Sequence, residues 1–336
     1  MALDSQVYSF SDWQLGVKTE ITTIGAAAAN PVINTTLVNI DGPATFTPGT
    51  VIISDIRSGT PGQIAGVVDA LVCPNGVYNE VSFSGIYDST IGPILLPNLF
   101  ASVVGTGPAG YGFAYNWTSP AGDHGGTVGP NISLGLSLIH PEPAKSISLI
   151  GVCLTNLTIS ADVEEENGRV KMSGTFGTGY KPVYDQTSPT TPAAYGSTFR
   201  YLTQATTTTQ VASCDNCVIK SISLTVNNPA KYLGFQGTNG DPQLFFRGSP
   251  EAEVLLNVTA KVDANTASLP SVWSAGTTVT NEISNNATWA SATNFGIKAA
   301  YCKILNVVES DVGAGYYDIS MKCMAHTEGD VVELIA

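Results

Sequence analysis

Charge is scarce in this chain of 336 residues. Only 12% of its residues are Asp, Glu, Lys or Arg, about half of the ~25% that is typical of soluble domains. Acidic residues outnumber Lys and Arg by 27 to 14, so the net charge is −13. A chain with this balance and no basic run is a poor candidate for binding nucleic acid by neutralising phosphates. A weakly charged surface rich in Thr, Ser and Asn suits a chain that packs against copies of itself.

Long apolar runs are also absent. The best candidate, residues 91–105, is shorter than the ~18 residues that a membrane-spanning helix requires, and it contains Pro93, Pro97 and Asn98. The first six residues, Met1-Ala-Leu-Asp-Ser-Gln, have neither the basic nor the apolar region of a secretory signal. We therefore expect a product of the cytoplasm that does not insert into a membrane.

Cysteine and histidine are too few and too scattered to predict a metal centre. Cys214-Asp-Asn-Cys217 matches C-x-x-C, but structural zinc needs two further ligands at similar spacing. No second C-x-x-C exists, and the three histidines stand apart. We interpret the six cysteines as free thiols. Cys323, on the apolar side of an alternating segment, is predicted to be a small core residue.

Catalytic signatures are missing as well. Asp123-His124 has no Gly-x-Ser-x-Gly elbow to complete a triad. Residues 105–110 spell G-x-G-x-x-G, but no strand precedes them and no helix opens after them. The sequence therefore predicts no catalytic residue, no metal and no cofactor, which favours a structural or binding role over an enzyme.

What the sequence does contain is strand periodicity. Apolar residues alternate with polar ones over 157–163 and again over 170–176, and Asn167-Gly168 between them supplies the positive φ angles of a tight turn. This pattern predicts a β-hairpin in a sheet with one buried and one polar face. Further strands are expected at 50–56, 81–87, 218–226, 253–263, 296–308 and 316–325. A short helix is expected within 95–104, and 265–292 is helix-compatible or irregular.

The order of these elements recurs, which predicts two tandem copies of one β-rich unit. We expect an N-terminal arm or loops over 1–48, a first β domain over 49–180, a linker over 181–213 and a second β domain over 214–336. Within the first domain, the Gly- and Pro-rich residues 105–130 are predicted to form a long loop.

Several segments resemble the tail tube proteins of tailed bacteriophages. They are Cys217-Val-Ile-Lys-Ser-Ile-Ser-Leu-Thr-Val-Asn-Asn228, Gly248-Ser-Pro-Glu-Ala-Glu-Val-Leu-Leu-Asn-Val-Thr-Ala260, the hairpin over 154–174, and the mid-chain order of strand, strand and helix from Thr50 to Val104. The resemblance covers about residues 45–330. It implies two tandem β-sandwich or barrel-type units, each with a short flanking helix, whose inner sheet completes a β-barrel between subunits.

The same resemblance implies how the chain acts. Subunits form rings, three chains with pseudo-sixfold symmetry being preferred and six chains the alternative, and the rings stack into a tube in the virion. DNA passes through the lumen without specific binding, and the tape measure, tail terminator and distal tail proteins are the other partners. Predicted lumen-facing residues are Thr158, Ser160, Asp162, Ser173, Asn257, Thr259 and Asp318. Predicted ring-to-ring contacts are Glu164, Glu165, Glu166, Asn167, Gly168, Tyr111, Tyr115 and Trp117.

Two other functions compete with this one. A carbohydrate-binding or adhesive β-sandwich would need exposed aromatic side chains, which Tyr111, Tyr115 and Trp117 could supply. A hydrolase on a β scaffold would need catalytic groups that the sequence does not reveal. Lys171, Lys261 and Lys322 fall on the same polar strand faces as the predicted lumen residues, so we expect them either to weaken a negative lumen or to pair across subunits.

Overall fold

The computed structural model describes 18 segments of the chain, and all statements below concern them. They are residues 12–20, 36–48, 51–54, 70–73, 79–99, 102–103, 112–115, 133–142, 144–180, 182–187, 195–204, 208–227, 231–232, 245–246, 253–284, 295–310, 315–324 and 332–335.

Strands dominate the described residues. In the first half of the chain these are β1 (Gln14–Glu20), β2 (Thr36–Leu37), β3 (Thr45–Thr47), β4 (Val51–Ser54), β5 (Ala70–Cys73), β6 (Asn79–Ile86), β7 (Ser102–Val103), β8 (Gly112–Tyr115), β9 (Ser133–Ile139), β10 (Ser146–Asp162), β11 (Lys171–Thr178) and β12 (Val183–Gln186). In the second half they are β13 (Thr208–Gln210), β14 (Ile219–Asn227), β15 (Lys231–Tyr232), β16 (Phe245–Phe246), β17 (Glu253–Lys261), β18 (Thr278–Ser284), β19 (Gly296–Ser310), β20 (Tyr316–Cys323) and β21 (Val332–Ile335). The helices are α1 (Gly92–Leu99), α2 (Leu269–Ala275) and the 3-10 turn η3 (Leu202–Gln204).

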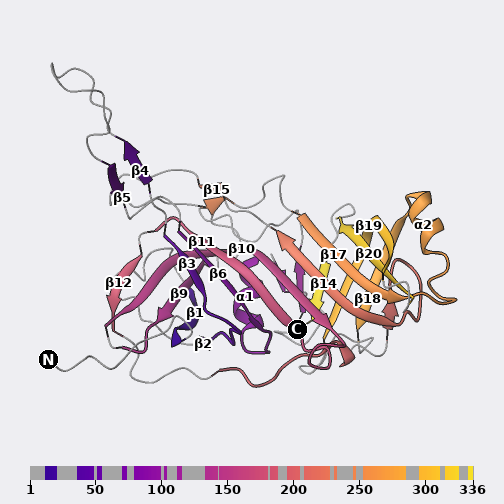
Figure 1. Ribbon diagram of the computed structural model, residues 1–336, viewed down its shortest axis with the longest axis horizontal. Helices are drawn as coiled ribbons and strands as arrows, with labels where there is room; N and C mark the ends of the chain where they lie inside the picture. The colour runs from indigo at the N-terminus through magenta and orange to yellow at the C-terminus, as the bar shows by residue number, and fades with distance from the viewer. Residues whose placement is uncertain are drawn as a thin grey trace, which may run out of the picture.

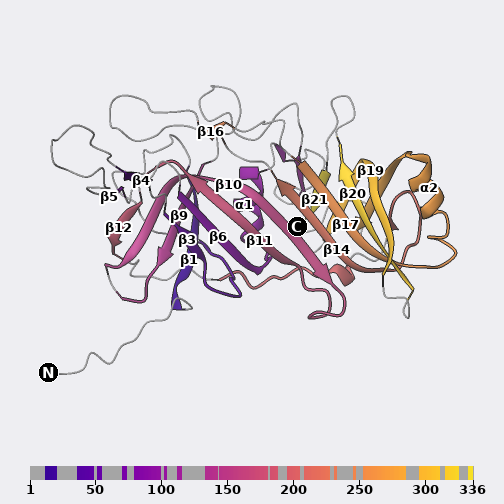
Figure 2. The ribbon, with the colours of Figure 1, turned by 45° about the horizontal axis from the view of Figure 1, so that its top comes forward.

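One large antiparallel sheet joins the two halves of the chain. Its central strands lie in the order β3–β6–β11–β10–β14–β17–β20–β19, with the pairing of β10 and β14 connecting the halves. Figures 1 and 2 show these strands running diagonally side by side, from the indigo and magenta half to the orange and yellow half. The mainly β prediction is confirmed.

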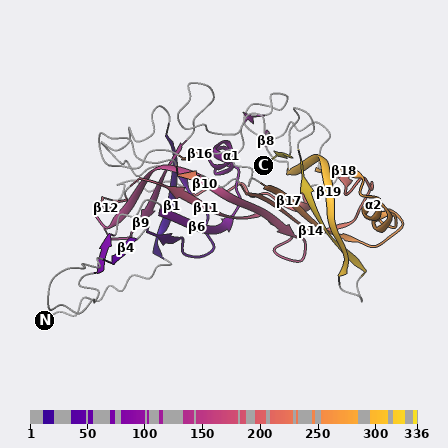
Figure 3. The ribbon, with the colours of Figure 1, turned by 90° about the horizontal axis from the view of Figure 1, so that it is seen from above.

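The long strands β10 and β19 each serve two sets of neighbours. The first part of β10 pairs with β9 and β12, and its later part pairs with β11 and β14. The register shifts between Leu149 and Val152, where Gly151 has a φ of 57° that favours glycine. The first part of β19 likewise pairs with β18, and its later part pairs with β20. Figure 3, seen from above, places α1 beside β10 and α2 at the far end beside β18 and β19.

The alternation of residue types explains the core. On β10, Leu157, Ile159 and Ala161 are buried, while the residues between them are partly exposed. The buried sides of β6, β11, β14, β17 and β20 continue the same apolar layer, and the rings of Phe83 and Phe176 stack with centroids 5.0 Å apart. Burying such a side chain contributes roughly 1.5–3 kcal/mol, so this face holds the sheet to α1 and to the other strands.

Four sequence predictions need correction. The expected arm contains β1, which pairs with β9 along its whole length. The expected helix over 95–104 begins instead at Gly92 and ends at Leu99, and β7 follows. The expected loop over 105–130 contains β8, which pairs with β21. The stretch over 265–292, expected to be helix-compatible or irregular, does contain the helix α2, but it also contains the strand β18, which was not expected.

The segment between the predicted domains packs closely on the first half. β12 pairs with β10, and residues 195–204 run over α1 and the hairpin through bridges of Phe199 to Asp88 and of Tyr201 to Arg169. Figure 1 shows this strip below the sheet. The predicted domain boundaries stay a prediction. No helix in the described part of the chain is long and apolar enough to cross a membrane.

Candidate functional site

A continuous polar face is the main surface feature of the sheet. Cross-strand partners in a sheet point to the same side, and the registers place polar residues opposite one another from strand to strand. One row runs Ser84, Ser173, Thr158 and Thr225, and another runs Lys171, Ser160, Ser223, Asn257 and Ser320. We call this side the polar face. Its polar members are Ser82, Ser84, Thr158, Ser160, Asp162, Lys171, Ser173, Thr175, Ser221, Ser223, Thr225, Asn257, Thr259, Lys261, Asp318, Ser320 and Lys322. The half-buried Leu255, opposite Thr225 and Lys322, and the half-buried Ile86, opposite Lys171, lie on the same side.

All seven predicted lumen-facing residues lie on the polar face. Thr158, Ser160 and Asp162 come from β10, Ser173 from β11, Asn257 and Thr259 from β17, and Asp318 from β20. Whether this face lines a lumen stays a prediction. The sequence prediction missed the members on β6 and β14, Ser82, Ser84, Ser221, Ser223 and Thr225, although the same alternation marks both strands.

The polar face is hollowed near its centre. An open groove of about 330 Å³ crosses β10, β14, β17 and β20 and is lined by Ser160, Asp162, Lys171, Asn257 and Asp318 among others. None of the groove's lining residues is aromatic. The groove therefore offers hydroxyl, amide and carboxylate groups but no ring on which a sugar could stack.

Hydroxyl groups on the polar face satisfy one another across strands. The Oγ1 atoms of Thr158 and Thr225 lie 3.0 Å apart, at the junction of the two halves. Thr259 Oγ1 donates to Asp318 Oδ1 at 2.7 Å. Such cross-strand pairs each contribute roughly 0.2–1 kcal/mol. These bonds tie β10 to β14 and β17 to β20 across the polar face.

Two of the three lysines expected on the polar face are paired inside their own chain. Lys171 Nζ lies 2.9 Å from Glu165 Oε2, and Lys322 Nζ lies 2.8 Å from Glu253 Oε1. The hydrogen bond from Lys171 lowers the pKa of Glu165 below its ordinary value, and the same bond raises the pKa of Lys171. Lys261 is exposed at the end of β17. Pairing of any of these lysines across subunits stays a prediction.

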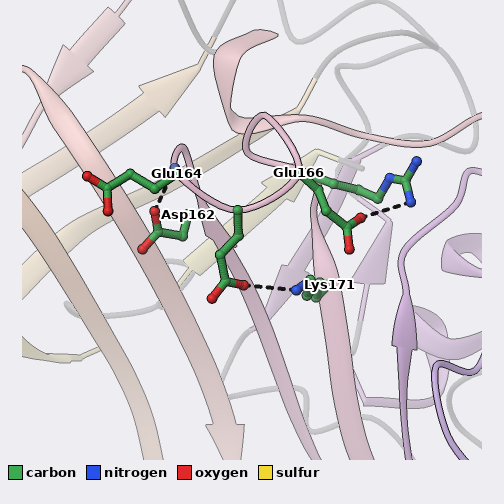
Figure 4. A network of polar contacts seen from close by, with 6 residues as sticks. Asp162, Glu164, Glu166 and Lys171 are labelled. Carbon is green, nitrogen blue, oxygen red and sulfur yellow. Dashed lines mark hydrogen bonds and ion pairs between the residues drawn. The ribbon is translucent and has the colours of Figure 1, made fainter.

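The acidic tip of the β10–β11 hairpin forms ion pairs within the chain, and Figure 4 shows those made by Glu166 and Lys171. Glu164 pairs with Lys220 at 3.0 Å and Glu166 with Arg169 at 2.9 Å, in addition to the pair of Glu165 with Lys171. Asp162 Oδ1 accepts a hydrogen bond from the backbone N–H of Glu164. The three glutamates are exposed, so each pair contributes at most about 1 kcal/mol.

The predicted turn at Asn167-Gly168 is confirmed, with φ angles of 60° and 74°, and Glu166 also has a positive φ of 49°. Gly168 is buried, because it packs beneath Leu202. Ring-to-ring contact through this tip stays a prediction. Of the predicted aromatic contacts, Tyr111 and Trp117 lie outside the described residues, and Tyr115 is described only as the last residue of β8.

At each end of the central sheet, the last strand pairs with a described strand along only one of its two sides. Residues 304–310 of β19 pair with β20, and among the described strands no other lies along them. Leu305 and Val308 on this segment are 52% and 48% exposed. At the other end, β3 pairs with β6 alone among the described strands. Exposed apolar edges of this kind are prone to pair with another chain.

A buried polar cluster lies under α1, away from the polar face. Asp88 and Arg200 are 0% and 1% exposed, and Asp88 accepts hydrogen bonds from Asn39 and from the backbone N–H groups of Thr90 and Ile91. Burial raises the pKa of the Tyr87 phenol beside them. This cluster fastens the strip over 195–200 to the start of α1.

Five cysteines, Cys153, Cys214, Cys217, Cys302 and Cys323, are free and buried, and Cys323 is confirmed as a core residue. Cys217 Sγ donates to the carbonyl oxygen of Cys214, and burial raises the pKa of Cys217 to about 11, so it stays protonated at neutral pH. Cys302 and Cys323 face each other with their Sγ atoms 3.2 Å apart. In the described part of the chain, no group of three His, Cys, Asp or Glu side chains could hold a metal ion.

Comparison with models of known protein families matches none of them to this chain, and comparison with curated proteins finds no similar sequence. Its function must therefore be inferred from the polar face, the sheet edges and the segments that they connect.

Proposed function

We propose that this protein is the tail tube subunit of a tailed bacteriophage, a structural protein that polymerises into stacked rings around a lumen for DNA. In this proposal the polar face lines the lumen, and the two edges of the central sheet join neighbouring subunits. The proposal needs no catalytic residue, metal or cofactor.

One observation carries the proposal. Eight strands form a single sheet whose one side is apolar and buried and whose other side is mainly polar from β6 to β20. Among the described strands, the strands at its two ends, β3 and the later part of β19, are paired on one side only. A monomer gains nothing from such edges, which are a hazard to solubility. Joining them head to tail in a closed ring satisfies the edge groups, as closure of a barrel does.

The charge of the chain also supports the proposal that the polar face lines a lumen for DNA. A ring of three chains would carry −39, three times the −13 of one chain. Lys171 and Lys322 are already paired with Glu165 and Glu253, and Lys261 is the remaining exposed lysine of this face. A lumen lined by the polar face would therefore present mainly hydroxyl, amide and carboxylate groups to DNA. Such a surface repels phosphates and lets a duplex slide without being held.

Two tandem units in one chain favour three chains in each ring, with six chains as the alternative. The tape measure, tail terminator and distal tail proteins remain proposed partners, and assembly in the host cytoplasm into the virion tail remains the proposed location. The competing carbohydrate-binding function receives no support from the groove, which has no aromatic lining.

Negative-stain electron microscopy of the purified protein tests the proposal directly. We expect hollow tubes or rings, and light scattering should report masses at multiples of 35.0 kDa. The variant Leu305→Lys with Val308→Lys should stay a folded single chain, because two charges on the open edge oppose strand pairing. Lys substitution at Glu142, an exposed residue in a turn far from either edge, is the control. A wild-type chain that stays monomeric at all concentrations and binds a glycan would refute the proposal.

A further inference from the structure

The two halves of the chain repeat one pattern of strand pairing. In the first half β6 is followed by α1, by the short strands β7 and β8, and then by β9, β10 and β11. In the second half β17 is followed by α2 and then directly by β18, β19 and β20, so β7 and β8 have no counterpart between α2 and β18. β9 pairs with the first part of β10 as β18 pairs with the first part of β19. β11 lies between β10 and β6 as β20 lies between β19 and β17.

An identical irregularity aligns the halves residue by residue. In the pairing of β10 with β11, Leu154 lies opposite Phe176 and Asn156 opposite Thr175, so Thr155 is an extra residue. In the pairing of β19 with β20, Ile304 lies opposite Met321 and Asn306 opposite Ser320, so Leu305 is extra. A one-residue bulge fixes register. Thr155 therefore corresponds to Leu305, and Thr158 to Val308.

The alignment extends across the sheet to its outer strands. Thr175 lies opposite Ser82, and its counterpart Ser320 lies opposite Asn257. Ser82 in turn pairs with Thr45 of β3, whereas Asn257 pairs with Ser223 of β14. Strand β3 is thus the counterpart of β14, with Thr45 matching Ser223 and Thr47 matching Thr225.

The pairing of β10 with β14 inside the chain indicates which strands of two neighbouring chains would pair with each other. β10 is covered along its later part by β14, with Thr158 opposite Thr225 and Ser160 opposite Ser223. The counterpart of β10 is β19, and the counterpart of β14 is β3. Among the described strands, the later part of β19 pairs with β20 alone and β3 pairs with β6 alone. The exposed fractions of two corresponding residues agree with this difference between β10 and β19. Thr155 on β10 is 8% exposed, and its counterpart Leu305 on β19 is 52% exposed.

We propose that β19 of one copy pairs antiparallel with β3 of a second copy in a defined register, with Val308 opposite Thr47 and Ser310 opposite Thr45. This inference rests on the proposed function, since it requires a ring of identical chains, and it specifies the partner strand and the register of the contact. The new junction repeats the β10–β14 junction, continues the polar face from one chain to the next, and covers Leu305 and Val308.

Disulfide cross-linking in the full chain tests the register. The double variant Thr47→Cys with Val308→Cys places thiols at the positions that match Thr158 and Thr225, whose hydroxyls lie 3.0 Å apart. That separation suits the close Cβ approach that a disulfide needs. Mild oxidation of the assembled variant should give a covalent ladder on a non-reducing gel, ending at three chains for a three-chain ring and at six for the alternative. Peptide mapping should join the segments that carry positions 47 and 308.

Two matched variants serve as controls. Thr45→Cys with Val308→Cys uses an equally exposed residue of β3 that is two positions out of register, about 6.6 Å along the strand, and should cross-link several-fold less. Thr158→Cys with Thr225→Cys should form the corresponding bond within one chain, which shows that the geometry of this junction accepts a disulfide. Each variant is assembled before oxidation, and its assembly is measured by light scattering.

The outcomes separate the two proposals. Assembly with preferential cross-linking of positions 47 and 308 supports both. Assembly without that cross-link, or with the out-of-register pair reacting as well or better, overturns the β19–β3 junction and leaves the tube proposal standing. A wild-type chain that does not assemble at any concentration overturns both.

Discussion

Asp88 is a buried carboxylate that holds three segments of the chain together. Its Oδ1 accepts hydrogen bonds from Thr90 and Ile91 at the start of α1, and its Oδ2 accepts one from Asn39 Nδ2 at 2.8 Å. The same Asn39 group donates to the carbonyl of Gly196 at 3.0 Å. We expect Asp88→Ala to lower the free energy of unfolding by about 3–5 kcal/mol, because the donors of Asn39, Thr90 and Ile91 would together lose a buried charged acceptor.

Urea unfolding followed by tryptophan fluorescence measures this change. Glu164→Ala is the matched control, since it removes an exposed carboxylate from an ion pair and should change the free energy by no more than about 1 kcal/mol. Equal effects of the two substitutions would contradict a stabilising role for the buried cluster.

Strand β6 depends on the absence of a side chain at Gly85. A Cβ atom there would lie 2.1 Å from the carbonyl oxygen of Asn39, whose segment bonds to the outer side of β6 through Ile86 and Ser84. We expect Gly85→Ala to push residues 39–41 away and to lower the free energy of unfolding by about 1–3 kcal/mol. Because this segment leads directly into β3, the substitution should also weaken assembly.

Gly42→Ala provides the comparison for this element. A Cβ at Gly42 meets nothing within 4 Å, and the residue lies in the same connection three positions before β3. Thermal unfolding and light scattering of both variants measure stability and assembly together. If Gly42→Ala proved as harmful as Gly85→Ala, backbone entropy would explain the loss better than crowding does.

The success of sequence prediction varied with how regular each element is. The hairpin of β10 and β11 was predictable because its alternation is unbroken and Asn167-Gly168 marks the turn. Strand β18 was not predicted because Asn281 interrupts its apolar pattern. Asn281 is buried, and its side-chain amide oxygen accepts a hydrogen bond from the backbone N–H of Ala212. Strand β1 was not predicted because Leu15 and Val17 are the only residues that mark its apolar side. Its partner strand β9 also lies more than 100 positions away in the sequence.

For the whole molecule, the polar face was predictable in kind but not in extent. Alternation identified Thr158, Asn257 and their neighbours as members of a polar strand face, yet it could not reveal that β10 and β14 pair and so merge two faces into one. The edges at β3 and β19 also could not be predicted from the sequence. An edge strand is recognised by the absence of a neighbouring strand, and this depends on how the described strands are arranged in space. The ion pairs of Lys171 and Lys322 likewise depend on side-chain positions that only the folded chain provides.

The balance of charge on the polar face leads to a prediction about DNA. Assembled wild-type protein should not retard duplex DNA in a gel even at low salt, where attraction to phosphates is strongest. Glu165→Gln with Glu253→Gln removes the partners of Lys171 and Lys322, and we expect this variant to retain DNA weakly and to release it as salt rises. Glu142→Gln with Asp215→Asn removes two charges from exposed turns outside the polar face and should behave like the wild type. Retention of DNA by the wild type would contradict a lumen that lets the duplex slide freely. Equal retention by both variants would show that net charge, rather than the paired lysines of this face, controls DNA binding.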